Sequence, residues 1–284
     1  MPFKDILLHA DNARGHDARI ALAAELARRH DAHLTGLFVI EPMNFVGFAA
    51  PGGTDFFQAQ AIEMMQEKYI ATRRALGERL GDAFKAAADR AGIASEWQVA
   101  EGDAASEITA HARHVDLVIL GQSDPELPGS GAGIAEAVLL GSGRPVLMVP
   151  YIGSGETIGR RVMVAWNASR EAARAVNDAL PLLADAASVI VLSINPARGA
   201  AGEGDLPAAD IALHLARHGV KAEAAQLTAE EVTVGDLILS RAADLGADLI
   251  VMGGYGHSRA REYAFGGATR TLLRNMTVPV LLSH

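Results

Sequence analysis

Residues 253–270, GGYGHSRAREYAFGGATR, combine glycines and cationic side chains more densely than any other stretch of the chain. Five glycines fall into two clusters, and His257, Arg259 and Arg261 lie between them. Glycine lets a backbone turn sharply or approach a ligand closely, and free N–H groups at the start of a helix bind anions. The spacing therefore favours a cradle for a phosphate-bearing ligand, with Gly266 and Gly267 placed just before a helix formed by ATRTLLRNM.

The same glycines could also have purely structural roles. The P-loop pattern Gly-x4-Gly-Lys-Ser/Thr does not occur in the sequence, and GGYGHS has the wrong spacing for the dinucleotide pattern Gly-x-Gly-x-x-Gly. The two clusters could be only a strand-exit turn and a tight helix entry. His257 could reach a phosphate or simply be exposed, and some of the nearby arginines could supply phosphate charge.

Composition limits the classes of partner and chemistry. The 284 residues, 50% hydrophobic and 21% charged, suit about two globular domains. A net charge of −9 argues against nucleic acid or an anionic membrane as the main partner. The chain has no cysteine, which excludes disulfides, thiolate catalysis and cysteine-type zinc sites. The N-terminal residues show no signal-peptide pattern and no apolar run is long enough to span a membrane, so we expect a cytoplasmic protein.

The chain is a tandem repeat. Three anchors occur in the same order in both halves: KDILLHAD with RRVMVAWN, DLVILGQSD with DLIVMGGYG, and AEAVLLGSGRPVLMVP with TRTLLRNMTVPVLLSH. YIGSGETIG between them has the composition of a linker. We therefore predict one domain over residues 1–150, a linker over 151–159 and a second domain over 160–284.

Apolar runs that alternate with helical patterns predict the fold of each half. Runs such as VIVLSI are apolar throughout, which is typical of parallel strands covered on both faces. The pattern predicts two doubly wound, Rossmann-like α/β domains of five strands each. Ser169 is a suitable N-cap for a helix over 169–183. The expected strands lie near 5–10, 33–40, 95–100, 116–120 and 145–149, then 161–166, 188–194, 221–227, 248–253 and 279–283.

A family resemblance follows from these residues. Gly253-x2-Gly256-x9-Gly266 resembles the Gly-x2-Gly-x9-Gly-Ser/Thr pattern of ATP-binding universal stress proteins, and VAWNASREAARAV (164–176) resembles their opening strand and helix. The resemblance covers both halves and implies a tandem protein of that family, with an adenine nucleotide alpha hydrolase-like fold. It also implies that the halves pair through their last strands as an intramolecular pseudo-dimer, with homodimerisation as a further possibility.

The resemblance implies a site for ATP, with Mg²⁺, in the second half. Asn167 stands where the family usually has Asp, and Gly267 stands where it usually has Ser or Thr, so that Thr269 would have to supply the missing hydroxyl. Within the glycine loop, His257 is a further candidate contact to phosphate. The residues that carry over are Ala165 and Asn167 for adenine and ribose, Ile194 for adenine, Gly253 and Gly256 for ribose and phosphate, and Gly266, Gly267, Ala268 and Thr269 for the phosphates.

The first half departs further from the pattern. It has the usual Asp at Asp11 and keeps Gly121, but Asp124 stands at the second glycine position. The loop is two residues shorter, so that Ala132 aligns with Gly266. A carboxylate near a triphosphate would repel it, and we predict that this half binds ATP weakly or not at all.

The remaining candidate groups give weaker indications. His111 with His114, and His214 with His218, have helical spacings that suit a shared metal, but a surface helix face is favoured because no third ligand is evident. Met and Phe at helical spacing in residues 56–76, on an expected helix over 56–91, are typical of a core or a subunit interface. With the apolar loop 42–54 they could instead form a lid or a pocket for an apolar ligand.

Three functions remain. The first is a stress-response regulatory protein that binds ATP in its second half and signals through the arrangement of its domains to a protein partner that the sequence does not identify. The second is a slow ATPase or phosphotransferase, which also needs a positioned water or acceptor. The third is a nucleotide-free interaction scaffold. The missing hydroxyl at Gly267 and the lack of an evident base favour binding over catalysis.

Overall fold

A computed structural model describes residues 2–42, 56–123, 131, 133–155, 157–195, 207–228, 232–255 and 262–284. In the first half the elements are β1 (Asp5–Ala10), α1 (His16–His30), β2 (His33–Ile40), α2 (Phe56–Ala91), β3 (Ser95–Glu101), α3 (Ala104–Ala112), β4 (Leu117–Gly121), α4 (Ile134–Ser142) and β5 (Val146–Val149). In the second half they are β6 (Arg161–Trp166), α5 (Arg170–Leu183), β7 (Ser188–Ile194), α6 (Pro207–Arg217), β8 (Ala222–Leu227), α7 (Val234–Asp244), β9 (Leu249–Gly253), α8 (Glu262–Asn275) and β10 (Val280–Ser283).

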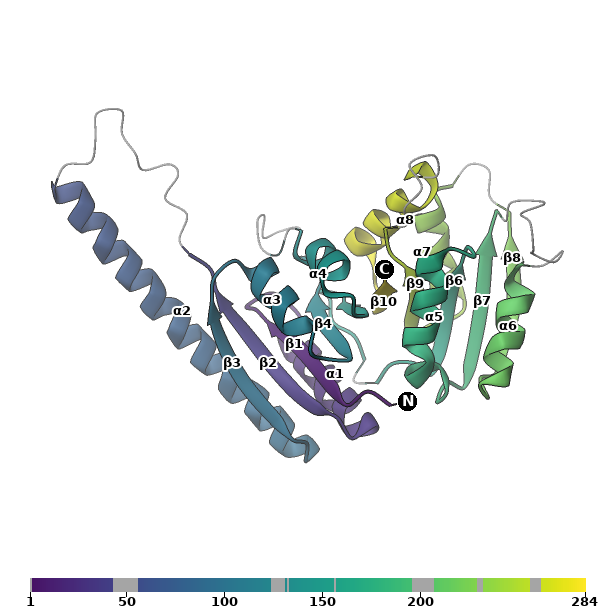
Figure 1. The fold of residues 1–284 in the computed structure, drawn as a ribbon, viewed down its shortest axis with the longest axis horizontal. Coiled ribbons are helices and arrows are strands. Elements are labelled where there is room, and N and C mark those ends of the chain that lie inside the picture. The colour runs from purple at the N-terminus through teal and green to yellow at the C-terminus, as the bar shows by residue number, and fades with distance from the viewer. Residues whose placement is uncertain are drawn as a thin grey trace.

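The strands form one continuous ten-stranded sheet in the order β3-β2-β1-β4-β5-β10-β9-β6-β7-β8 (Figure 1). Pairing is parallel within each half, and the halves join through β5 and β10, which pair antiparallel with Leu281 opposite Leu147. The predicted tandem of two doubly wound five-stranded units is confirmed, and the last strands of the two halves do pair. The winding direction reverses between β1 and β4 in one half and between β6 and β9 in the other.

Helices cover both faces of the sheet, which explains why the strands are apolar throughout. Helices α1, α2, α5 and α6 pack over one hydrophobic core, and α3, α4, α7 and α8 pack over another. Successive side chains of a strand point to opposite faces, so Ile6 and Leu8 enter the first core and Leu7 enters the second. Among the described residues, no helix is both long and apolar enough to cross a membrane.

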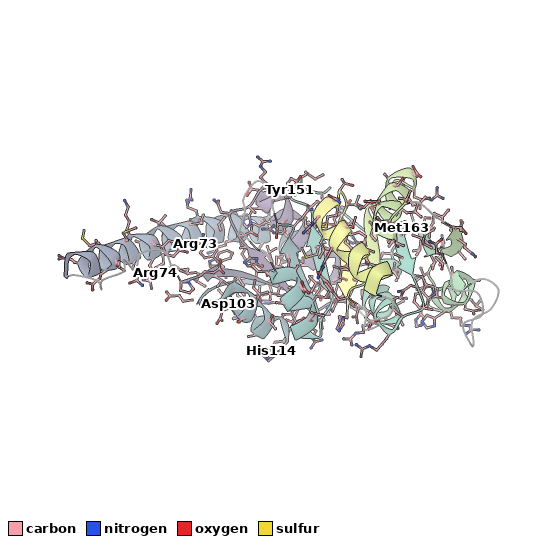
Figure 2. The ribbon with its side chains drawn as sticks, turned by 90° about the horizontal axis from the view of Figure 1, so that it is seen from above. Arg73, Arg74, Asp103, His114, Tyr151 and Met163 are labelled. Atoms are coloured by element: carbon pink, nitrogen blue, oxygen red, sulfur yellow. The ribbon has the colours of Figure 1, made fainter. Side chains whose placement is uncertain are left out.

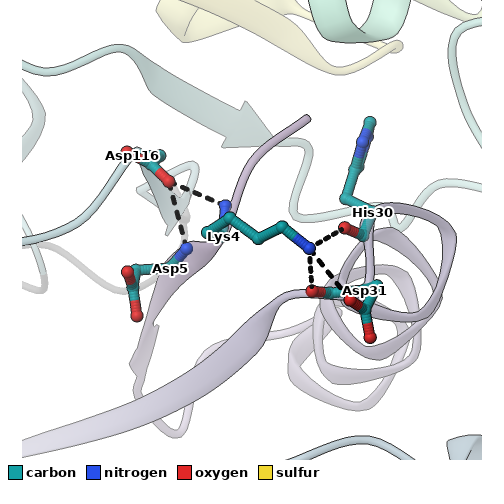
Figure 3. Close-up of polar contacts among 5 residues, drawn as sticks. All are labelled: Lys4, Asp5, His30, Asp31 and Asp116. Carbon is teal, nitrogen blue, oxygen red and sulfur yellow. Dashed lines mark hydrogen bonds and ion pairs between the residues drawn. The ribbon is translucent and has the colours of Figure 1, made fainter. Parts of the chain in front are cut away.

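The Asp-Leu anchor of the repeat has a structural role at the edge opposite the strand carboxyl ends. Asp116 Oδ2 accepts hydrogen bonds from the backbone N–H groups of Lys4 and Asp5, at 2.7 and 3.1 Å (Figure 3). In the second half, Asp248 accepts from the N–H groups of Gly159, Arg160 and Arg161 at 3.0 to 3.1 Å. Each aspartate thereby satisfies backbone donors at the start of its domain's first strand, and the duplication extends to this detail.

Helix α2 is much longer than the other helices, as predicted. Its 36 residues span about 54 Å at 1.5 Å per residue, and its N-terminal part projects beyond the sheet (Figures 1 and 2). Met64 and Met65 are 65% and 42% exposed, so of the two expected roles, a core and a subunit interface, the core is wrong for these residues and the interface stays a prediction. Core packing requires a neighbouring element, and the sheet ends before this part of the helix. The proposed lid over 42–54 lies, except for Pro42, outside the described residues.

Candidate functional site

The carboxyl ends of β6 and β9 form the candidate site of the second half. These strands are neighbours, with Ala165 opposite Met252, at the point where the winding direction reverses. In open parallel sheets this is where ligands bind. The expected adenine contacts Ala165 and Ile194 lie at the ends of β6 and β7, each 8% exposed. The strand order therefore brings Ala165, Asn167, Ile194 and Gly253 to one edge of the sheet.

Asn167 is held in a defined orientation at this edge. Its Oδ1 accepts a hydrogen bond from the N–H of Ser169 at 3.2 Å. Ser169 is the N-cap of α5, as predicted, and its Oγ accepts from the N–H of Ala172 at 3.1 Å. Since the side-chain oxygen Oδ1 of Asn167 already accepts the N–H of Ser169, the side-chain Nδ2 group is the part of Asn167 that can donate to a ligand. An amide donor there suits a ribose oxygen or a ring nitrogen.

Gly253 has a packing reason to be glycine. A Cβ at this position would lie 2.5 Å from the backbone nitrogen of Ala172 and 2.6 Å from the carbonyl carbon of Glu171. The end of β9 therefore touches the first turn of α5 directly, and any side chain would push the two apart. The glycine spacing that suggested a ligand contact is explained at this position by helix–strand packing, whether or not a ligand also approaches.

The second glycine cluster lies inside α8, which is a correction to the prediction. The helix begins at Glu262 and not after Gly267. Residues 262–265, EYAF, contain no helix breaker, so the helix starts before the glycine pair despite the poor helix propensity of glycine. N–H groups beyond the first turn are bonded to carbonyls four residues earlier. Phosphate capping by Gly266 and Gly267 through free N–H groups therefore requires the start of this helix to open.

Of the remaining predicted phosphate contacts on α8, Gly267 is exposed, whereas Ala268 and Thr269 are buried. Gly267 is exposed, and a Cβ added there would meet no atom within 4 Å. Ala268 and Thr269 are 3% and 1% exposed, and Gly235 at the start of α7 packs against Ala268. Gly267 is thus a motif position that a ligand can reach. The predicted contacts Gly256 and His257, with Arg259 and Arg261, lie outside the described residues.

The first half has a cavity of about 470 Å³ at the equivalent carboxyl ends of β1 and β4. Its lining includes His9, Asp11, Tyr69, Arg73 and Gly121. The place where the sequence predicts weak or absent ATP binding therefore contains a cavity, and both acidic and basic side chains line it.

A buried arginine contacts two residues that line this cavity, Asp11 and Gly121. Arg19 of α1 is 1% exposed, and its Nη2 donates to Asp11 Oδ1 at 2.5 Å. A Cβ on Gly121 would lie 1.7 Å from Arg19 Nη1, so the guanidinium fills the space that the glycine leaves. Sequence reasoning missed Arg19. The available signal was an arginine on the apolar stripe of a helix, where a buried charge needs a partner.

The glycine at the end of the fourth strand meets different parts of the first helix in the two halves. The Arg19 guanidinium lies against Gly121, whereas the backbone and Cβ of Glu171 lie against Gly253. The connection from β1 to α1 spans residues 11–15 and that from β6 to α5 only 167–169, which shifts the helix register between the repeats. Glu171 is 5% exposed. Burial raises its pKa, but the N–H groups at the helix start, the Ser169 hydroxyl and Arg170 outweigh this and hold the pKa below its usual value.

Burial and the Asp11–Arg19 ion pair together set the protonation of Asp11, His9 and His16. Burial raises the pKa of Asp11, but the Arg19 guanidinium, with His9 and the N–H of Ala13, lowers it below its ordinary value overall. Burial, with Arg19 adding to it, lowers the pKa of His9 to about 4 and that of His16 to about 4. At pH 7 the cavity residues Asp11 and His9 therefore belong to a buried cluster of one ion pair and two neutral histidines, completed by Arg19 and His16.

The two histidine pairs with helical spacing make the following contacts in the part of the chain that the structure describes. The rings of His214 and His218 lie with their centroids 4.7 Å apart and their planes tilted by 57°, and His111 Nδ1 lies 2.8 Å from the carbonyl oxygen of Glu107. No group of three or more potential ligands occurs among these described residues. The surface-helix interpretation of both pairs is the one that the geometry supports.

Gln122 links the two halves next to the first-half cavity. It follows Gly121, is 3% exposed, and its Nε2 donates to the carbonyls of Leu273 and Arg274 at 3.0 and 2.9 Å. Its Oε1 accepts from the N–H of Tyr151 at 3.1 Å. One side chain thus joins the cavity wall of the first half to the last turn of α8, the helix that carries the phosphate motif of the second.

Comparisons with known proteins agree with this architecture. The profile of the Universal stress protein family matches residues 2–150 and 159–284. A universal stress protein from Archaeoglobus fulgidus DSM 4304 is similar over 98% of this chain and 95% of its own, at 18% identity and a TM-score of 0.75. A functionally unknown protein from Pseudomonas aeruginosa PAO1 is similar over 99% and 92%, at 15% identity and a TM-score of 0.57. No curated protein matches the sequence.

Proposed function

Because the chain belongs to the universal stress protein family, we propose that it is a cytoplasmic, regulatory stress-response protein that binds ATP at the carboxyl edge of its second half. The proposal takes residues 1–150 and 160–284 as the two domains. Among proteins of similar fold, one universal stress protein is described in complex with cAMP and another, from Archaeoglobus fulgidus, in complex with dAMP. Those ligands belong to those proteins, and it is the edge residues of this chain that support a nucleotide here.

The observation that carries the proposal is the junction of β6 and β9. The two strands end side by side at the reversal point, with the amide of Asn167 oriented by Ser169 and the buried ends of β6 and β7 beside it. An apolar wall with one oriented polar donor is what an adenosine group needs. Gly267 is exposed, and we expect the phosphates to lie on its side of the sheet edge.

The charges at this edge support one placement of the triphosphate in the proposed complex. The ionised Glu171 carboxylate at the start of α5 disfavours phosphate close to that end of α5, and the exposed Arg270 on α8 favours phosphate near α8. The described residues hold no cluster of carboxylates for a cation, so Mg²⁺ would be held chiefly by phosphate oxygens and water, as is usual for this ion. Glu171 is engaged with the start of α5 and with Arg170, which supports binding in place of hydrolysis.

Isothermal titration of ATP with Mg²⁺ tests the proposal through two substitutions at one position. Gly267→Ser restores the usual hydroxyl where a side chain meets no atom, and a hydrogen bond to a charged group is worth about 1.5–3 kcal/mol, so affinity should rise about tenfold or more. Gly267→Glu places a carboxylate there and should abolish binding. The matched control, Ala135→Glu, alters the first-half cavity and should leave one ATP bound per chain.

Three results would contradict the assignment. ATP binding that is lost in Ala135→Glu but kept in Gly267→Glu would move the nucleotide to the first half. Two equivalents of ATP per wild-type chain would refute the predicted weakness of that half. The absence of binding to both the wild type and Gly267→Ser would leave the scaffold function. Gly253 is unsuitable for this test, because its substitution disturbs packing irrespective of any ligand.

A further inference from the structure

The outer edge of the first half carries a groove that the nucleotide site does not use. It lies between β3, the terminal strand of the sheet, and the flank of α2, and has a volume of about 770 Å³. We call it the β3–α2 groove. Its lining comprises Arg74, Glu78, Gly81, Asp82, Phe84, Lys85 and Asp89 from α2, Ile93 from the turn, and Ser95, Glu96, Trp97 and Val99 from β3.

The backbone of β3 offers unpaired hydrogen-bonding groups along this groove. The carbonyl of Ala94 accepts from Leu34, and the N–H of Gly102 donates to Ile40. Pairing between these points is one to one, without a bulge. Alternate residues of a strand direct their N–H and C=O groups to opposite sides, so the even-numbered residues face β2. The backbone groups of Ser95, Trp97 and Val99 therefore face the open edge, where they can template another strand.

The floor of the groove is a rigid apolar platform. The Trp97 indole lies over Gly36 and against Gly81, so that a Cβ on either glycine would come within 2.6 to 2.9 Å of its ring. Phe84 packs beside it, with ring centroids 5.4 Å apart. Val99 is 51% exposed. The opposite edge strand, β8, has the sequence AEAAQL, with small or polar side chains and no aromatic residue.

The walls of the groove are predominantly acidic. Glu78, Asp82 and Asp89 lie on the exposed flank of α2 at helical spacing. The Glu96 carboxylate of β3 accepts hydrogen bonds from Gln98 and Thr35 and lies on the face of the sheet opposite to Trp97. Two cations are present, Lys85 and Arg74. Arg74, labelled in Figure 2, is already paired with Glu101 at 2.9 Å. A ligand that fills this groove therefore needs positive charge.

We propose that the β3–α2 groove binds an extended basic peptide segment of a partner protein, which adds to the sheet as a strand beside β3. Its backbone pairs with Ser95, Trp97 and Val99, its apolar side chains rest on Trp97 and Val99, and its lysines or arginines meet Glu78 and Asp82. This combination of backbone pairing with side-chain pockets is the usual form of strand addition. A second copy of this chain is disfavoured, because two-fold pairing of β3 edges would bring the acidic flanks of both α2 helices together.

The first test uses the labelled peptide Lys-Thr-Val-Thr-Val-Thr-Lys in fluorescence anisotropy, which places its valines and its lysines on one face of the added strand; the same peptide with glutamate in place of lysine is its charge control. Val99→Pro removes an N–H that faces the open edge without removing a bond to β2, a position at which edge strands tolerate proline. It should weaken binding at least fivefold. Val99→Thr keeps that N–H and a β-branched side chain, and should bind within twofold of the wild type.

A second pair of substitutions tests the charges and does not touch the strand. Glu78→Lys with Asp82→Lys, both at exposed positions of α2, should weaken the lysine peptide at least tenfold and raise affinity for the glutamate peptide. Equal binding of the lysine peptide to the wild type and to both sets of variants would overturn the proposal. Failure of the wild type to bind the lysine peptide would do the same. Dimerisation in sedimentation velocity that Val99→Pro abolishes would assign the edge to a second copy and reject the peptide.

Discussion

Two of the three buried histidines among the described residues of the first half predict a specific acid sensitivity. His9 and His16 are 9% and 7% exposed, and each has a pKa of about 4 in the folded protein against 6.5 for the free side chain. Since the folded pKa is the lower one, the unfolded chain binds more protons between pH 6.5 and pH 4. The stability contribution of these neutral histidines is therefore fully present above pH 6.5 and is lost as the pH falls through that window.

The magnitude follows from the two pKa values. One pKa unit corresponds to about 1.4 kcal/mol, so each histidine costs about 3 kcal/mol once the pH is below 4. Between pH 7 and pH 5 the loss is about 2 kcal/mol per histidine, or about 4 kcal/mol for both, when the proton uptake is integrated over the window. This is a large fraction of the stability of an ordinary domain. The effect arises chiefly from burial and is reinforced by Arg19, whose charge opposes a second cation beside it.

The measurement is urea unfolding followed by circular dichroism at half-unit steps from pH 7 to pH 5. The double variant His9→Gln with His16→Gln replaces both imidazoles by amides that do not titrate, and its free energy of unfolding should change far less over this range than that of the wild type. His114→Gln, at an exposed position after α3, is the matched control and should follow the wild type. A wild-type loss below about 1 kcal/mol, or an equal loss in the double variant, would refute the reasoning.

Three further predictions concern packing and buried hydrogen bonds. Gly253→Ala should lower the free energy of unfolding by about 1–3 kcal/mol, because the added Cβ meets the backbone of α5. Gly267→Ala should not lower it, because a Cβ there meets no atom. Equal shifts of the melting temperature in the two variants would contradict this prediction. Gln122→Leu leaves two carbonyls of α8 without their partner and should cost about 1–3 kcal/mol, with faster hydrogen exchange in the last turn of α8 than in α5 as the diagnostic. Asp248→Ala orphans three N–H groups at the start of β6 and should cost about 2 kcal/mol or more in urea unfolding, and a loss no greater than that of Asp248→Asn would argue against the capping role.

Much of the fold was predictable because its signals are local. Uninterrupted apolar runs such as VIVLSI marked parallel strands with helices on both faces, and Ser169 marked the start of α5 because an N-cap needs only its own next turn. The Asp-Leu anchors located the fourth strand of each half, although their hydrogen bonds to the start of the first strand emerged only in three dimensions. The same repeat order predicted that Asn167 and Gly253 would come to one edge of the sheet.

The identity of the groups that fill that edge depended on tertiary structure. The sequence cannot distinguish a glycine at 253 that makes room for a ligand from one that makes room for the first turn of a helix. The structure shows the second role, because α5 packs directly on the end of β9. Arg19 comes to Gly121 because the five-residue connection before α1 changes the register of that helix relative to its counterpart. Helix α8 starts at Glu262 although its glycines suggested a later start. The sequence by itself determined which elements form and in which order, because strand and helix patterns are local; the tertiary structure decided which side chains meet, because burial and charge pairing depend on residues far apart in the chain.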